Sequence, residues 1–81
     1  MVPSLQKGDR IVTAKDLGAI VVAHRKTQRL TQLDLAGLGH TGNRFICELE
    51  NGKPTLQFDK VMAILDQLGL DVIIVARGSA T

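Results

Sequence analysis

Two neighbouring polar residues, Asn43 and Arg44, follow a short interruption in the otherwise helical stretch LTQLDLAGLGHTGNRFICELENGKP, residues 30–54. An asparagine amide donates and accepts hydrogen bonds at once, which matches the edge of adenine, and an arginine can donate two parallel bonds to guanine. At the start of a helix, both side chains also stand beside backbone N–H groups that suit a phosphate. The pair favours contact with nucleic acid, and a helical hairpin with incidental polar ends is the alternative.

The other residues with chemical potential form no recognisable catalytic or metal-binding set. His24 and His40 are far apart in the sequence and have no accompanying set of carboxylates or cysteines, so no metal site is expected. Glu48 and Glu50 are two positions apart on a predicted helix and face different directions. Cys47 is the only cysteine, which rules out an intramolecular disulfide and suits packing better than a redox switch. We therefore expect no catalytic residue, no cofactor and no enzymatic activity.

The composition indicates one small domain with an aliphatic core. Of the 81 residues, 44% are hydrophobic, but Phe45 and Phe58 are the only aromatic ones. A core of this size is marginal, and dimer formation is a common remedy. Residues 1–30 carry six lysines and arginines against two aspartates, a local net charge of +4 within a formal net charge of +2. This bias favours an acidic partner, and a solvated surface is the alternative.

The sequence shows neither a signal-peptide pattern nor an apolar run long enough to span a membrane. A cytoplasmic protein without a membrane partner is the expectation.

Caps and apolar spacing predict four helices. Thr13 and Asp16 have the spacing of a capping box before a helix over about residues 14–28. Threonines are expected to cap the next three helices: Thr31 before a helix ending at residues 39–40, Thr41 before one ending at Gly52, and Thr55 before one ending at Gly69. The expected buried side chains of these three helices are Leu35, Ala36 and Leu38; Phe45, Ile46 and Leu49; and Phe58, Val61, Met62, Leu65 and Leu68.

The end of the chain has a different pattern. Residues 72–75 are all β-branched and lie between Gly69 and Gly78, which favours a strand over a helix. A lone strand leaves its backbone groups unpaired, so we expect it to pair with the same strand of a second copy. The predicted dimerisation residues are Val72, Ile73, Ile74 and Val75. The expected organisation is a lead-in at 1–12, a DNA-binding domain at 13–70, this strand at 71–77 and a tail at 78–81.

The second and third predicted helices, joined by a corner of about four residues, match the helix-turn-helix arrangement. In that arrangement the third helix would enter the major groove of DNA.

These residues carry a family resemblance. Residues 14–70 resemble the Cro/C1-type (XRE) helix-turn-helix family through LTQLDLA and GNRFICELENGKPT, which match its Leu-Thr-Gln, its Leu-Ala and its recognition helix ending in Glu-x-Gly. More narrowly, RFICELENGKPT followed by an amphipathic helix and LGLDVIIVAR resembles the HipB-type antitoxins. The resemblance implies an all-α, lambda-repressor-like bundle of four to five helices, with a short C-terminal β-strand paired across a homodimer.

The same resemblance implies a function. It indicates a transcriptional repressor that binds double-stranded operator DNA, represses its own operon and pairs with a HipA-type kinase toxin. A stand-alone regulator without a toxin, and a protein-binding module of the same fold, stay open as alternatives. Leu33 is expected on the outer side of the second helix, where it could touch such a partner.

The resemblance also assigns roles to residues. Gln32 is implied to contact phosphate and to brace the recognition helix, Asn43 and Arg44 to contact bases, and Cys47 to face the DNA backbone. Arg25 and Glu50 are implied to form a pair that ties the first helix to the third. His40 stands where the family usually has glycine, and Thr41 replaces an apolar corner residue. The full set of expected DNA contacts is Thr31, Gln32, Thr41, Gly42, Asn43, Arg44, Cys47 and Lys53.

Overall fold

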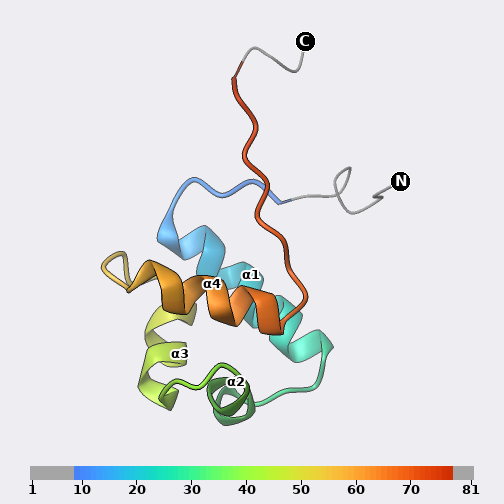
Figure 1. Cartoon of the computed structure of the whole chain (residues 1–81), viewed down its shortest axis with the longest axis vertical. Coiled ribbons are helices and arrows are strands. Elements are labelled where there is room, and N and C mark those ends of the chain that lie inside the picture. The colour runs from blue at the N-terminus through green and yellow to red at the C-terminus, as the bar shows by residue number, and fades with distance from the viewer. Residues whose placement is uncertain (1–8, 78–81) are drawn as a thin grey trace.

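The computed structural model describes residues 9–77, and within that range it contains four α-helices and no strand. The helices are α1 (Ala14–Thr27), α2 (Gln32–Leu38), α3 (Asn43–Glu50) and α4 (Phe58–Gln67), as Figure 1 shows. The predicted all-α class is confirmed. The first eight residues of the expected lead-in and the expected tail at 78–81 lie outside the described residues. None of the four helices is long and apolar enough to cross a membrane.

Helices α1 and α2 begin with equivalent capping boxes. Thr13 Oγ1 accepts a hydrogen bond from the Asp16 N–H at 3.3 Å, and Asp16 Oδ2 accepts one from the Thr13 N–H at 3.0 Å. Thr31 and Asp34 repeat the arrangement at 3.0 and 2.9 Å. Backbone N–H groups of Val12 and Thr13 lower the pKa of Asp16, and that of Thr31 lowers the pKa of Asp34. Local sequence therefore fixes both helix starts.

The starts of α3 and α4 differ from the prediction. Gly42, not Thr41, is the N-cap of α3, because the Thr41 N–H bonds back to the Ala36 carbonyl at 2.9 Å and closes the end of α2. Gln57, not Thr55, is the N-cap of α4, and neither N-cap makes a side-chain capping bond. Leu56 packs against the core before α4 begins, which moves the helix start beyond the threonine.

The corner between α2 and α3 depends on two unusual positions. His40 adopts a left-handed backbone with a φ of 55°, where histidine is better tolerated than most residues. At Gly39, a Cβ atom would collide with the Ile64 Cδ1 atom of α4, so the absence of a side chain lets the corner approach α4. The corner is therefore a close-packed turn.

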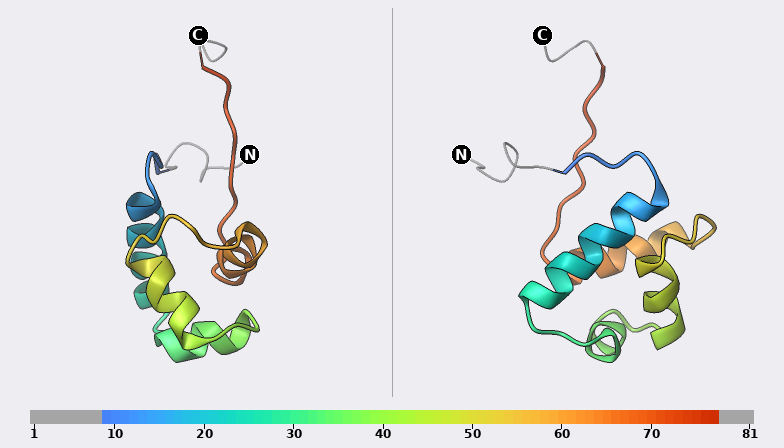
Figure 2. Two further views of the ribbon diagram at one scale, coloured as in Figure 1. Left: turned by 90° about the vertical axis from the view of Figure 1, so that its left-hand side faces the viewer. Right: turned by 180° about the vertical axis from the view of Figure 1, so that it is seen from behind.

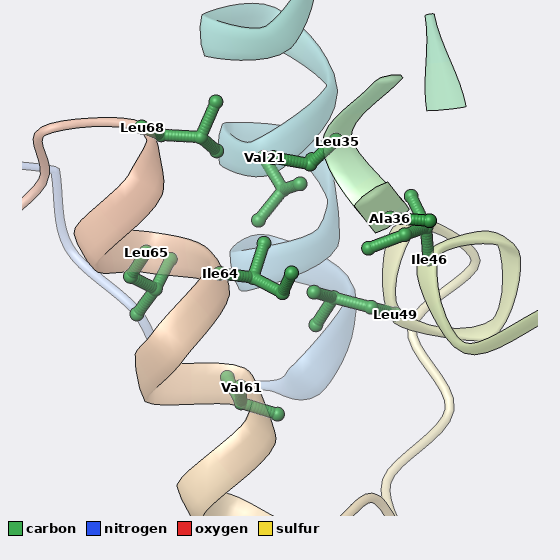
Figure 3. Packing of buried hydrophobic residues seen from close by; sticks show 9 residues of the cluster. All are labelled: Val21, Leu35, Ala36, Ile46, Leu49, Val61, Ile64, Leu65 and Leu68. Carbon is green, nitrogen blue, oxygen red and sulfur yellow. The ribbon is translucent and has the colours of Figure 1, made fainter. Parts of the chain in front are cut away.

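The core takes side chains from all four helices, as Figure 3 shows. Its nine buried hydrophobic residues are Val21, Leu35, Ala36, Ile46, Leu49, Val61, Ile64, Leu65 and Leu68. Of the residues predicted to be buried, Phe45 and Met62 are half-buried and two are exposed: Leu38 is 46% exposed and Phe58 is 70% exposed. Each is a terminal residue of its helix, Leu38 the last of α2 and Phe58 the first of α4. Ile64, which was not part of the predicted stripe, is fully buried instead.

After α4, the C-terminal segment, residues 71–76, leaves the helical body, as Figures 1 and 2 show. Val72, Ile73, Ile74 and Val75 are between 48% and 93% exposed. Within the described part of the chain, no backbone hydrogen bond joins them to another residue. Their pairing as a strand across a dimer stays a prediction, since a strand needs a partner.

Candidate nucleic-acid interface

Helices α2 and α3 cross steeply on either side of the corner. In Figure 1, α2 is seen nearly end-on while α3 lies across the view, and α3 packs against both α1 and α2. This is the geometry of a helix-turn-helix, in which the second helix of the pair presents its outer side to a partner. What α3 can do therefore depends on how its inner side is held and on what its outer side exposes.

The inner side of α3 is fixed by a buried charged group. Glu50, whose side chain is 5% exposed, accepts hydrogen bonds from Arg25 Nε at 2.6 Å and Arg25 Nη2 at 3.1 Å. Arg25 Nη1 donates to the Leu30 carbonyl at 2.8 Å, and Gln32 Nε2 donates to Glu50 Oε1 at 2.9 Å. The hydrogen bond with Glu50 raises the pKa of Arg25. One carboxylate thus joins α1, α2 and α3, and the pair expected from the resemblance is present.

A close approach of α1 to α3 makes this pair possible. A Cβ atom placed on Gly18 would lie 2.6 Å from the Leu49 carbonyl oxygen and 2.7 Å from that of Glu50. Real Cβ atoms do not come so near to backbone oxygens, so any larger residue would push the helices apart. Glycine at this position lets the two helices lie close enough for Arg25 to reach across.

The outer side of α3 carries the residues expected to contact bases. Asn43 and Arg44 are exposed in the first turn, and the Arg44 side chain is 90% exposed. Arg44 Nε donates to Glu48 Oε2 at 3.3 Å, and Lys53 Nζ donates to the same oxygen at 3.2 Å. The hydrogen bond from Lys53, with a smaller contribution from Arg44, lowers the pKa of Glu48. Two expected DNA contacts therefore meet at one carboxylate.

The other expected contacts lie nearby in the motif. The Thr31 hydroxyl oxygen caps α2. Gln32 is half-buried; one N–H of its side-chain amide donates to Glu50, and the other N–H is available for a second hydrogen bond. Thr41 is half-buried and Gly42 exposed in the corner. Cys47 is half-buried on α3, and Asn51 Nδ2 donates to its Sγ at 3.5 Å.

Sequence reasoning missed two outward-facing residues, Glu48 and Asn51. Each stands four positions after an expected DNA contact, Glu48 after Arg44 and Asn51 after Cys47. Because side chains four positions apart are neighbours on a helix, that spacing was the signal that could have found them.

No metal centre competes with this interpretation among the described residues. Within residues 9–77, no group of three or more His, Cys, Asp and Glu side chains is placed to hold a metal ion. His24 is half-buried on α1 and His40 stands exposed in the corner.

The fold and the exposed helix define a helix-turn-helix protein, and comparison with known proteins gives the family. The chain is 49% identical over 69 residues to an uncharacterized HTH-type transcriptional regulator, y4mF, of Sinorhizobium fredii; the match covers 85% of this chain and 91% of the relative. This chain therefore belongs to the HTH-type transcriptional regulators. No family model matches it.

Solved structures of HipB share the fold. Those described as "HipB-O4 20mer complex" and "Structure of HipA-HipB-O2-O3 complex" each match with a TM-score of 0.78 and 20% sequence identity. Both matches cover 86% of this chain and 99% of the matched chain. The HipB-like helix-turn-helix bundle expected from the sequence is thereby confirmed, and the C-terminal strand stays a prediction.

Proposed function

We propose that this regulator is a homodimeric, sequence-specific repressor that binds operator DNA through α3, and that it is the antitoxin of a HipA-like kinase. The observation that carries the DNA-binding part is the contrast between the two sides of α3. The inner side is held by Ile46, Leu49 and Glu50, whereas Arg44 on the outer side is 90% exposed. A rigid helix with an exposed arginine at its first turn fits direct contact with bases.

The remaining expected contacts fit the sugar–phosphate backbone. Lys53 follows α3, and its ammonium group can neutralise a phosphate in any sequence. The second amide N–H of Gln32 can donate to a phosphate while the first keeps the bond to Glu50. Gln32 would then link the sugar–phosphate backbone of the bound DNA directly to Glu50, which holds α3 in place. This division separates groups that hold the DNA from those that select a sequence.

A dimer is supported by apolar surface that the single chain leaves uncovered. An open groove of about 1280 Å³ runs between α1, α4 and the chain segments on either side of them. Leu17, Ile20 and Phe58 line it together with Val72 and Ile73 of the C-terminal segment. In the dimer, the strands at 72–75 pair with each other and the two subunits cover this groove. The two α3 helices would then meet half-sites roughly 34 Å apart, or a multiple of that spacing.

The antitoxin part of the proposal is supported by the shared fold. HipB, which this chain resembles over nearly its whole length, is held in one of the solved structures together with HipA. We infer a corresponding kinase partner for this chain, bound through surface away from α3 so that DNA and partner can be held together. Leu33, 70% exposed on α2, is a candidate contact with that partner.

The test of DNA binding compares two cations of the same cluster. Arg44→Ala should lose about 1–3 kcal/mol of preference at one base pair, because a bidentate contact is removed. Lys53→Ala should weaken binding to all sequences alike and reduce the salt dependence, because a phosphate contact is removed. Fluorescence anisotropy on the DNA upstream of the gene, with single base-pair changes, measures both. Equal losses on every sequence for Arg44→Ala would make it a phosphate contact, and no binding of the wild type at low salt would favour a protein-binding module.

The test of the antitoxin part uses the neighbouring gene. Co-expression of the chain with the product of the adjacent reading frame should give a stable complex in size-exclusion chromatography and an inhibited kinase. If this chain elutes alone and the product of the adjacent reading frame stays an active kinase, the antitoxin part fails and a stand-alone repressor is the conclusion.

A further inference from the structure

Glu48 occupies an unusual place for an acid, on the side of α3 that faces the proposed DNA. Its side chain is 26% exposed, and its Oε2 atom accepts hydrogen bonds from both Arg44 and Lys53. A carboxylate so close to phosphates is repelled by them, so it weakens DNA binding in general, and its place on this side of α3 requires another explanation.

The contact with Arg44 uses only one corner of the guanidinium group. Nε donates to Glu48, and the terminal nitrogens Nη1 and Nη2 make no hydrogen bond within the described chain. An arginine that contacts guanine side by side donates two parallel bonds to O6 and N7. The bond at Nε therefore leaves a donor pair available for a base while it restricts the direction of the long side chain. Restricting a flexible side chain before binding lowers the entropy lost when it docks.

Lys53 is the second cation that pairs with Glu48. With Arg44 and Lys53 both beside one carboxylate, the three side chains together carry a net charge of +1 in the unbound protein. An exposed ion pair of this kind contributes little to stability in water. Its contribution grows where DNA excludes the solvent, because the same charges then interact in a lower dielectric.

We propose that Glu48 is a positioning residue that orients Arg44 toward guanine and thereby sets sequence preference, while its charge weakens binding to unrelated DNA. The proposal rests on the proposed function of α3 as the DNA-contacting helix. It predicts that removing Glu48 raises the affinity for unrelated DNA and lowers the preference for the correct base pair. A loss of helix stability would not produce this combination.

The experiment measures the affinity of the full chain for its upstream DNA, for the same DNA with the Arg44-dependent base pair changed, and for an unrelated duplex. Glu48→Ala should lower the preference for the correct base pair roughly tenfold. It should also tighten binding to the unrelated duplex. Glu48→Gln, which keeps an oxygen that can accept from Nε, should restore most of the preference. Asp66→Ala, which removes an exposed acid from the last turn of α4, is the charge-matched control and should leave the preference unchanged.

The double variant Arg44→Ala/Glu48→Ala decides whether Glu48 acts through Arg44. It should show the same base preference as Arg44→Ala alone, because nothing is left for Glu48 to orient. Wild-type preference in Glu48→Ala, no rescue by Glu48→Gln, or a further change in the double variant would each overturn the proposal. None of these results would affect the proposal that α3 binds operator DNA, which fails if the wild type shows no preference for its upstream DNA.

Discussion

Helix α3 and the C-terminal segment both expose side chains to solvent, but only α3 is held in place by the rest of its own chain. On the inner side of α3, Ile46 and Leu49 are buried in the core, and Glu50 accepts hydrogen bonds from Arg25 and Gln32. The C-terminal segment has nothing of this kind, and Ile74 is 93% exposed. The exposed surface of α3 is polar and suits a charged partner, whereas that of the segment is apolar and suits a second copy of the chain.

This difference separates two requirements of the proposed function. A single chain already holds α3, the proposed base-contacting helix, in a fixed position, so the proposed contacts to one half-site need no other subunit. In the proposed dimer, the spacing between two half-sites is set only when the C-terminal segments pair. Changes behind α3 should therefore act on folding and on each half-site, while changes in the segment should act on assembly.

The largest effect is expected behind α3, from Glu50→Ala. This change leaves the part-buried Arg25 side chain, 12% exposed, without its carboxylate partner, and the loss of hydrogen bonds between charged groups costs about 1.5–3 kcal/mol. Urea unfolding followed by circular dichroism measures the loss. Glu48→Ala, which breaks only solvent-screened surface pairs, is the matched control and should leave the free energy of unfolding nearly unchanged. Equal stabilities of the two variants would show that the buried network does not hold α3.

An intermediate effect is expected in the C-terminal segment, from Ile73→Pro. Proline removes a backbone donor and fixes φ, so the paired strand should be lost. We expect a shift toward monomer in sedimentation velocity and a loss of operator affinity of about a hundredfold, since the two half-sites no longer bind as one unit. Circular dichroism should show unchanged helix content, because residue 73 lies outside all four helices. A wild-type chain that sediments as a monomer and a variant with full operator affinity would contradict both the strand and the dimer.

The smallest effect concerns the helix starts of α1 and α2. Asp16 and Asp34 have lowered pKa values in the folded chain because they accept backbone hydrogen bonds. Their contribution to stability is present above the pKa of an unfolded aspartate, about 3.9, and is lost as the pH falls through the lower folded values. Asp34→Asn should therefore flatten the acid limb of a plot of unfolding free energy against pH. An unchanged acid limb would assign the loss to other carboxylates.

How far the sequence predicts this molecule depends on how local each feature is. The capping pattern of Thr13 and Asp16 follows from a short-range rule and was found. The left-handed backbone of His40 was indicated only through the family resemblance, which usually has glycine at that position. The N-caps at Gly42 and Gln57 were missed because Thr41 and Leu56 are used elsewhere, one to close α2 and the other to fill the core.

Features that depend on distant contacts were harder to predict. Spacing alone placed Phe58 in a buried stripe, although it lies open beside the apolar groove. The hydrogen bond between Gln32 and Glu50 could not be predicted from their spacing in the sequence. It matches the bracing role of Gln32 that the family resemblance implied. The sharing of Glu48 by Arg44 and Lys53 was not foreseen, because Lys53 lies beyond the end of α3, where helical spacing no longer indicates which side chains are neighbours.

The central claim is that α3 selects a DNA sequence, and one titration tests it most directly. The unmodified chain is titrated onto fluorescent DNA from upstream of its own gene and onto a shuffled duplex of equal length and composition, at several salt concentrations. The account predicts affinity at least a thousandfold higher for the upstream DNA at physiological salt, with both affinities falling as salt rises. Equal affinity for the two duplexes at every salt concentration would contradict it.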